Sequence, residues 1–254
     1  MSDLEFDGLT AVVTGGASGI GLATAQLLTA RGARVACLDL NPQDVPEPMV
    51  RAHVDVADEE SVRAGVTWAA ELLGGVDILV NNAGIGAQGG IEDNPDHEWR
   101  QVLEVNVLGV VRTTRAVLPY LRRSAAPAIV NTCSVAATAG LPDRVLYSAS
   151  KGAVLAMTRA MAADLVADGI RVTCVNPGTV ATPWVDRLLG RADDPADERA
   201  ALRARQPLGR LVTPDEVAAA IAYLASPLAG ATTGTDLAVD GGMDGLRLRP
   251  PRPS

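Results

Sequence analysis

The sequence predicts an α/β protein with a doubly wound, mostly parallel sheet of seven strands, flanked by helices on both faces. Three observations lead to this prediction. Short apolar runs rich in β-branched residues alternate with longer segments of helical periodicity along most of the chain. A glycine-rich turn at residues 15–21 joins the first such run to the first helical segment. The length of 254 residues suits one large domain, and we expect residues 1–254 to form a single one.

Composition and charge narrow the class of protein. Apolar residues make up 48% of the chain, which is typical of a globular core, and the net charge of −8 argues against a nucleic-acid partner. No apolar run approaches the ~20 residues of a membrane span, and the N-terminus lacks a signal-peptide pattern. Cys37, Cys133 and Cys174 each fall inside a predicted strand, so we expect buried thiols in a cytoplasmic protein, with neither a disulfide framework nor a metal site.

The first strand, the glycine turn and the first helix follow in the order that a dinucleotide-binding loop requires. Residues 10–14 read as a buried strand and residues 22–31 as a helix. Glycines let the backbone approach a pyrophosphate closely, and the helix N-terminus offers unpaired N–H groups. Gly15, Gly19 and Gly21 have the spacing Gly-x3-Gly-x-Gly, which differs from the general Gly-x-Gly-x-x-Gly pattern.

The second strand, residues 34–39, ends in Asp39, eighteen residues past Gly21. An acidic residue at an offset of about 20 residues binds the ribose hydroxyls of a dinucleotide. Its charge repels the extra phosphate of NADP, and neither Ser18 nor Leu40 is basic. We therefore expect NAD as the cofactor. The alternative is that Asp39 only begins a turn.

The remaining elements complete the alternation. Residues 41–49 hold three prolines and are too short for a full crossover helix. Further strands are predicted at 51–56, 77–80, 128–133, 171–175 and 236–240, and further helices at 59–73, 96–121, 146–168 and 215–225. Asp55 reads as a cap for the helix that begins near Asp58. Asn106 interrupts the apolar face of the helix at 96–121, and a buried amide there needs hydrogen-bond partners.

The helix at 146–168 carries the residues with the most specific chemistry. Tyr147 and Lys151 are four residues apart and share one face of that helix. A phenol is a poor base at neutral pH, and an ammonium group beside it favours the phenolate. Ser134 ends the strand before this helix, where its hydroxyl can lie opposite the phenol. Taken singly, the pair also fits a solvated helix face, and Ser134 fits a turn or a cap.

Together these motifs resemble the short-chain dehydrogenase/reductase family, whose members have a Rossmann-type fold. The resemblance runs from Leu9 to Gly242. It rests on the glycine turn, on Asn81-Asn82-Ala83-Gly84 after the fourth strand, on the set Ser134, Tyr147 and Lys151, and on residues 176–182 after the sixth strand.

The resemblance implies roles for particular residues. It implies the catalytic set Asn106, Ser134, Tyr147 and Lys151, in which Asn106 binds a water that relays protons to Lys151. It assigns adenine contacts to Asp55 and Val56, and nicotinamide contacts to residues 177–182. The full cofactor-binding set is Gly15, Ser18, Gly19, Ile20, Gly21, Asp39, Leu40, Asp55, Val56, Asn82, Ala83, Gly84, Tyr147, Lys151, Pro177, Gly178, Val180 and Thr182. It also implies a homo-oligomer, a tetramer or a dimer, whose interface is built by the helix at 146–168, with its alanine-rich face, and by the helix before the fifth strand.

These expectations define a function. We expect NAD-dependent oxidation of a small-molecule secondary alcohol, or the reverse, with a sugar, polyol or sugar acid as the favoured substrate. The arginine-rich segment 183–207 is typical of a lid over a substrate, and residues 245–254 read as a loose tail. The alternatives within the family are a 3-ketoacyl reductase and a hydroxysteroid dehydrogenase. A non-catalytic NAD-sensing scaffold is a more distant alternative, because a binder does not need the complete Ser134, Tyr147 and Lys151 set.

Overall fold

All seven predicted strands form one parallel sheet in the computed structural model, which describes residues 4–190 and 194–249, except for the side chains of 186–188. The strand order is β3-β2-β1-β4-β5-β6-β7, and every neighbouring pair is parallel. The strands are β1 (Thr10–Thr14), β2 (Arg34–Asp39), β3 (Val50–His53), β4 (Ile78–Asn81), β5 (Ala128–Thr132), β6 (Arg171–Pro177) and β7 (Asp236–Val239).

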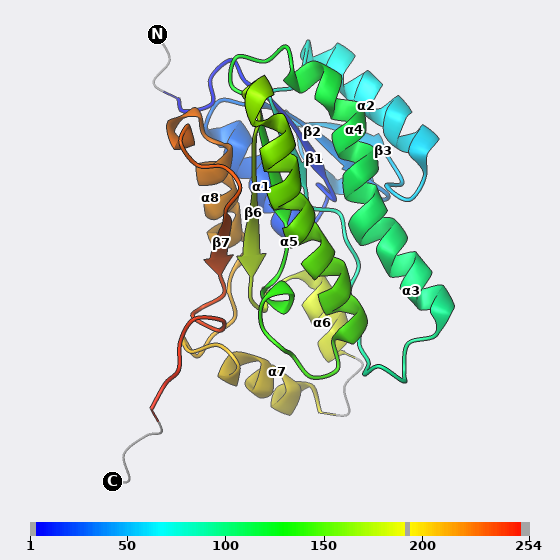
Figure 1. Ribbon diagram of the computed structural model, residues 1–254, viewed down its shortest axis with the longest axis vertical. Helices are drawn as coiled ribbons and strands as arrows, with labels where there is room; N and C mark the ends of the chain where they lie inside the picture. Colours follow the sequence, from blue (N-terminus) through cyan, green and yellow to red (C-terminus); the bar gives the residue numbers. More distant parts are fainter. Residues whose placement is uncertain (1–3, 191–193, 250–254) are drawn as a thin grey trace.

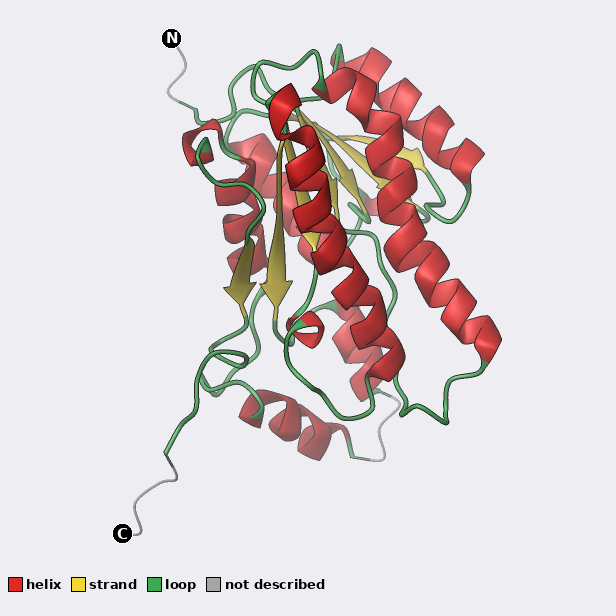
Figure 2. Ribbon diagram, in the orientation of Figure 1, coloured by secondary structure: helices red, strands yellow, loops and turns green. Residues whose placement is uncertain are grey.

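Helices cover both faces of this sheet (Figures 1 and 2). The α-helices are α1 (Gly19–Ala30), α2 (Glu59–Leu73), α3 (Asp96–Leu103), α4 (Gly109–Leu121), α5 (Val145–Leu165), α6 (Pro183–Leu189), α7 (Pro195–Ala204) and α8 (Pro214–Ala225). Short 3-10 turns are η1 (Pro42–Asp44), η3 (Val135–Ala137), η4 (Val166–Asp168) and η5 (Pro227–Ala229), and η2 (Glu104–Leu108) is a π-helical turn. Within the described residues, none of the helices has the length and apolar character to span a membrane.

The core is divided by the sheet because successive strand residues point to opposite faces. Ala11 and Val13 of β1 pack with α1 and α8 in one cluster. Val12, between them, packs with α2, α4 and α5 in the other. All three side chains are fully buried. A strand buried on both faces explains the unbroken apolar runs in the sequence.

The structure corrects several element boundaries. β3 ends at His53, so Asp55 and Val56 lie in the loop beyond it, and Cys133 lies one residue past β5. The N-cap of α2 is Asp58, which accepts a hydrogen bond from the Glu60 N–H, and not Asp55. The lid segment, predicted only as a loop, forms the helices α6 and α7.

The π-helical turn η2 interrupts the single helix predicted at residues 96–121. Its position coincides with Asn106, the polar residue that breaks the apolar periodicity of that segment. One inserted residue in a helix leaves a wider turn, and such turns are common at functional sites. The sequence marked the position but not the change of helical geometry.

The topology places a binding edge at the carboxyl ends of the strands. β1 leads to β2 and β3 on one side, and the chain then returns to β4 on the other side of β1. In open α/β sheets, ligands bind in the crevice at such a switch point. In Figure 1 the ends of β6 and β7 point toward the loops that carry α6 and α7.

Candidate active site

The glycine turn leaves the N-terminus of α1 open to an anion. Gly15 and Gly19 have φ angles of 62° and 53°, which side chains rarely adopt, and a Cβ atom on Gly21 would overlap the Gly15 carbonyl oxygen. Ser18 is the N-cap of α1, yet its side chain makes no capping hydrogen bond, and the first turn holds no acidic residue. The first N–H groups of the helix therefore suit the pyrophosphate of a dinucleotide.

Asp39 lies at the tip of β2 beside this turn. Its carboxylate accepts hydrogen bonds from the N–H groups of Ala17, at 3.1 Å, and Asn41, at 2.9 Å. Leu40, which follows it, is half exposed. Both carboxylate oxygens are thus oriented by backbone, and their remaining lone pairs can accept from ribose hydroxyls.

Asn82 fastens the loop after β4 to the glycine turn. Its amide nitrogen donates to the carbonyl oxygens of Thr14 and Gly15, and its oxygen accepts from the Thr132 hydroxyl. The Thr14 hydroxyl in turn accepts from the N–H groups of Asn82 and Ala83. These bonds hold the loops after β1, β4 and β5 in one arrangement. Thr14 and Thr132 had no role in the sequence prediction.

Asn106 is 1% exposed and fully engaged within the protein. Its amide nitrogen donates to the Ile85 carbonyl at 2.8 Å and to the Ser150 hydroxyl at 3.1 Å. Its oxygen accepts from the Ile85 N–H at 2.8 Å. These contacts clamp the loop after β4 to α5, which is the structural role that a buried amide was expected to have. The water relay to Lys151 stays a prediction.

Lys151 is a buried cation at the base of the site, with 5% exposure. In the described structure its ammonium group donates one hydrogen bond, to the Thr132 carbonyl at 2.9 Å. It also lies 5.8 Å from the centre of the Tyr147 ring. An ammonium group has three donors, so it retains capacity for a ligand's hydroxyls. Tyr147 is only half buried.

Ser134 caps the turn η3 just after β5. Its hydroxyl oxygen accepts from the Ala136 N–H at 3.1 Å, which leaves the hydroxyl proton for another acceptor. The neighbouring Cys133 donates its thiol to the Lys151 carbonyl. A hydrogen bond with Cys133, together with burial, raises the pKa of the Cys174 thiol. The same hydrogen bond lowers the pKa of Cys133, which lines the cavity. All three cysteines are free and buried.

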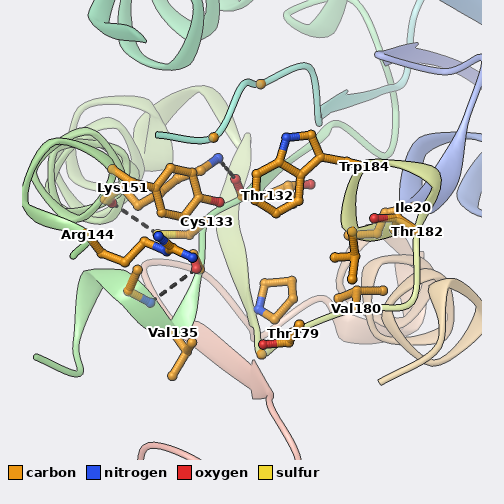
Figure 3. A pocket seen from close by; sticks show the side chains of 18 of the residues that line it. Ile20, Thr132, Cys133, Val135, Arg144, Lys151, Thr179, Val180, Thr182 and Trp184 are labelled. Atoms are coloured by element: carbon orange, nitrogen blue, oxygen red, sulfur yellow. Dashed lines mark hydrogen bonds between the residues drawn. The ribbon is translucent and has the colours of Figure 1, made fainter. Parts of the chain in front are cut away.

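One cavity of about 370 Å³ brings many of the predicted residues together. Its lining includes Ser18, Ile20, Asn82, Gly84, Ser134, Tyr147, Lys151, Pro177, Gly178, Val180 and Thr182. Figure 3 shows Lys151 and Arg144 on one side of it, with Ile20, Val180 and Thr182 on the other. The remaining predicted residues, Gly15, Gly19, Gly21, Asp39, Leu40, Asp55, Val56, Ala83 and Asn106, are not in its lining.

The loop after β6 is held in place by the buried side chain of Gln206. A Cβ atom on Gly178 would lie 2.6 Å from the side-chain oxygen of Gln206 and 2.9 Å from the Cα atom of Asp240, so a side chain there would force the backbone to shift. Gln206 is 1% exposed and donates to the Thr179 carbonyl at 3.2 Å. Gln206 follows α7, so this contact ties the lid to the loop predicted to hold the nicotinamide. The sequence offered no signal for it.

Two lid and loop residues complete the wall. Trp184 of α6 packs against Gly86, and both line the cavity. Arg144, at the start of α5, lines it as well and was missed by sequence reasoning. Its position three residues before Tyr147, one helical turn away, was the signal available. Of the arginines predicted on the lid, Arg205 lines the cavity, while Arg191 lies outside the described residues.

Known proteins resemble this chain in both sequence and architecture. A family model described as enoyl-(acyl carrier protein) reductase matches residues 15–244. The cis-4-hydroxycyclohexanecarboxylate dehydrogenase of Sinomonas cyclohexanicum is 43% identical over 246 residues, covering 91% of this chain and 95% of that protein. The chain belongs to the short-chain dehydrogenase/reductase family. The 2-(R)-hydroxypropyl-CoM dehydrogenase of Xanthobacter autotrophicus, another relative, is 39% identical over 91% of this chain and 96% of its own length.

The fold agrees with this membership. The ligand-free structure of Thermoplasma acidophilum aldohexose dehydrogenase superimposes with a TM-score of 0.91 at 32% identity, covering 99% of both chains. As a short-chain dehydrogenase/reductase, the protein is an oxidoreductase that acts on CH–OH groups with a nicotinamide cofactor. The Rossmann-type sheet predicted from the sequence is confirmed.

Proposed function

We propose that this protein is an NAD-dependent dehydrogenase that oxidises a small secondary alcohol to a ketone. The observation that carries the proposal is one cavity lined both by Ser134, Tyr147 and Lys151 and by Ser18 and Ile20 at the open N-terminus of α1. A protein that only binds a dinucleotide needs the residues at the N-terminus of α1 but not the catalytic set. Ser134, Tyr147 and Lys151 supply the acid–base chemistry that oxidation of an alcohol requires.

The chain's residues act on the alcohol proton. The Ser134 hydroxyl donates to the reacting oxygen and holds it toward Tyr147. Tyr147, as phenolate, removes the hydroxyl proton, so that the oxygen becomes a carbonyl as the carbinol C–H bond breaks. Lys151 stabilises the phenolate and donates to the ribose hydroxyls. A nicotinamide cofactor, when bound, would supply the hydride acceptor for the two electrons that the alcohol loses.

The choice of NAD rests on Asp39. Its carboxylate is held by two backbone N–H groups at the tip of β2, close to the glycine turn. A fixed negative charge there favours ribose hydroxyls and repels a 2′-phosphate.

We also propose a homo-oligomer, a tetramer or a dimer, because α5 exposes a stripe of small residues, Ala149, Ala156, Ala160 and Ala163, suited to close helix contact. We further propose that the protein is cytoplasmic, because three free, buried thiols are typical of a reducing compartment.

The test is NADH formation by the purified protein across a panel of substrates. The panel holds polyols, aldohexoses, hydroxysteroids and hydroxy acids, including 4-hydroxycyclohexanecarboxylate, the compound for which one relative is named. We expect turnover with NAD+ by the wild type and a loss of at least about 1,000-fold in Tyr147→Phe with NADH binding retained. Tyr120→Phe is the matched control, because Tyr120 is a partly buried tyrosine of α4 that does not line the cavity. Equal turnover by Tyr147→Phe, or NADH binding with no turnover of any panel member, contradicts the proposal.

A further inference from the structure

The cavity carries positive charge that the oxidation of an alcohol does not use. Its charged lining residues are Arg144, Lys151 and Arg205, and none of the lining residues is an aspartate or a glutamate. The chain as a whole has a net charge of −8. A cationic cavity in an acidic protein attracts small anions and holds them where water is partly excluded.

Neither cavity arginine is neutralised by the side chains that the structure describes. Arg144 donates to the backbone carbonyl of Asp143 at 2.9 Å, and no ion pair within 4.0 Å joins it or Arg205 to a described carboxylate. Burial and the nearby charge of Arg205 lower the pKa of Arg144, against the weaker opposing charges of Tyr147, Asp143 and Glu198. Two like charges held close together favour a bound anion between them.

Both arginines sit on anchored backbone. An isolated parallel bridge joins Arg144 to Gly89, and the Gly89 N–H donates to the Asp143 carbonyl at 3.0 Å. Arg205 precedes Gln206, whose buried side chain holds the end of α7 against the loop after β6. The two guanidinium groups are therefore presented by fixed segments, which lowers the entropy cost of binding an anion.

Arg144 lies away from the place where the phosphates of the cofactor are expected to bind. Arg144 lies one helical turn before Tyr147, next to the proposed reaction centre. Figure 3 shows it across the cavity from Ile20, which belongs to the α1 N-terminus where a pyrophosphate is expected. The cavity lining also includes apolar side chains, among them Val135, Leu141 and Leu202.

From this arrangement we infer that the substrate is a hydroxy acid: a secondary alcohol with an apolar carbon skeleton and a carboxylate, which Arg144 and Arg205 bind while the hydroxyl lies at Tyr147. The inference rests on the proposed function and narrows its substrate class. An Arg–carboxylate pair is planar and bidentate, so it orients the substrate as well as attracting it. Apolar walls suit an aliphatic or alicyclic skeleton better than a polyol.

The first test compares the best hydroxy acid of the panel with its own methyl ester. We expect the wild type to favour the acid in kcat/KM. In Arg144→Gln and Arg205→Gln the acid-to-ester ratio should fall about 10- to 100-fold, the value of a charged hydrogen bond. Arg203→Gln is the matched control, because Arg203 is an exposed arginine two residues before Arg205, in the last turn of α7, and does not line the cavity. Turnover of neutral alcohols alone, or a ratio unchanged in both variants, overturns the inference while the proposed function stands.

The second test does not depend on turnover. Calorimetric titration of cyclohexanecarboxylate, which lacks the reacting hydroxyl, into the NADH complex measures anion binding directly. We expect the wild type and Arg203→Gln to bind it alike, and Arg144→Gln to bind at least about tenfold more weakly. Equal affinity for the uncharged amide overturns the inference. If no alcohol is oxidised in any panel, the proposed function fails, and this titration still decides whether the two arginines bind a carboxylate.

Discussion

Trp184 of the lid rests directly on Gly86, so closely that a single Cβ atom at residue 86 would overlap the indole ring. Gly86 belongs to the loop after β4, and Trp184 belongs to α6, almost a hundred positions later in the chain. Both line the cavity. The indole ring of Trp184 can therefore pack against this loop only because residue 86 has no side chain.

Gly86→Ala is expected to displace Trp184 and open the cavity. We expect KM for the alcohol to rise on the order of tenfold, because a wall of the site shifts, with little change in the free energy of unfolding. Gly140→Ala is the matched control, since a Cβ atom there meets no atom within 4 Å. Steady-state kinetics and urea unfolding of both variants check the prediction. Identical KM values in the two variants contradict it.

Asp39→Ser is expected to relax the choice of cofactor. Removing the carboxylate would remove both the proposed hydrogen bond to the ribose and the repulsion of a 2′-phosphate. The ratio of kcat/KM for NAD+ over NADP+ should fall roughly 100-fold. Asp44→Ser changes an exposed carboxylate on η1 and should leave the ratio as it is. A wild type that already prefers NADP+ would refute the role of Asp39.

A buried amide network supports the strand that leads to Ser134. Asn131 of β5 is 0% exposed, accepts from the Asn81 amide at 2.9 Å and donates to the Thr158 hydroxyl at 2.9 Å. Asn131→Ala leaves both partners without it, and we expect the free energy of unfolding to fall by about 3 kcal/mol. Thr158→Val should cost less on its own, and the double variant less than the sum, because the two share one hydrogen bond. Urea unfolding of the three variants measures this, and strict additivity would exclude the coupling.

Glu216 makes the stability of α8 depend on pH. Its hydrogen bonds with Arg210 and with the Thr213 N–H lower its pKa to about 2, and Thr213 completes a capping box. A pKa lowered by folding gives stability that is present above the unfolded value of 4.5 and is lost as the pH falls toward 2.

Glu216→Gln should therefore destabilise the protein at pH 7 by about 1 kcal/mol or less, because the pair is exposed, and by nothing measurable near pH 2.5. Glu71→Gln, an exposed glutamate on α2, should show no such trend. Unfolding curves at pH 7, 4 and 2.5 compare the two variants with the wild type. A deficit in Glu216→Gln that persists at pH 2.5 would rule out the charge as its source.

The order of strands and helices, the glycine turn and the spacing of Tyr147 and Lys151 could all be predicted from the sequence. Each is a local pattern, because periodicity and turn chemistry depend on neighbours within a few positions. The boundaries were less certain. β3 ends three residues earlier than predicted. In the loop beyond it, the Asp55 N–H donates to the Ser61 hydroxyl, and the Asp55 carboxylate accepts from the Ala57 N–H.

The tertiary structure alone decided what surrounds the phenol. Arg144 lies just before α5 and Arg205 just after α7, and the two share a cavity only because α7 folds back beneath the carboxyl ends of the strands. Gln206 under Gly178, Trp184 on Gly86 and the Asn81–Asn131–Thr158 chain likewise join residues distant in sequence. No local periodicity encodes such contacts, because they arise from how whole elements pack. The reaction class could therefore be predicted from the sequence, whereas the presence of two arginines in the same cavity as Tyr147 became apparent only in the folded protein.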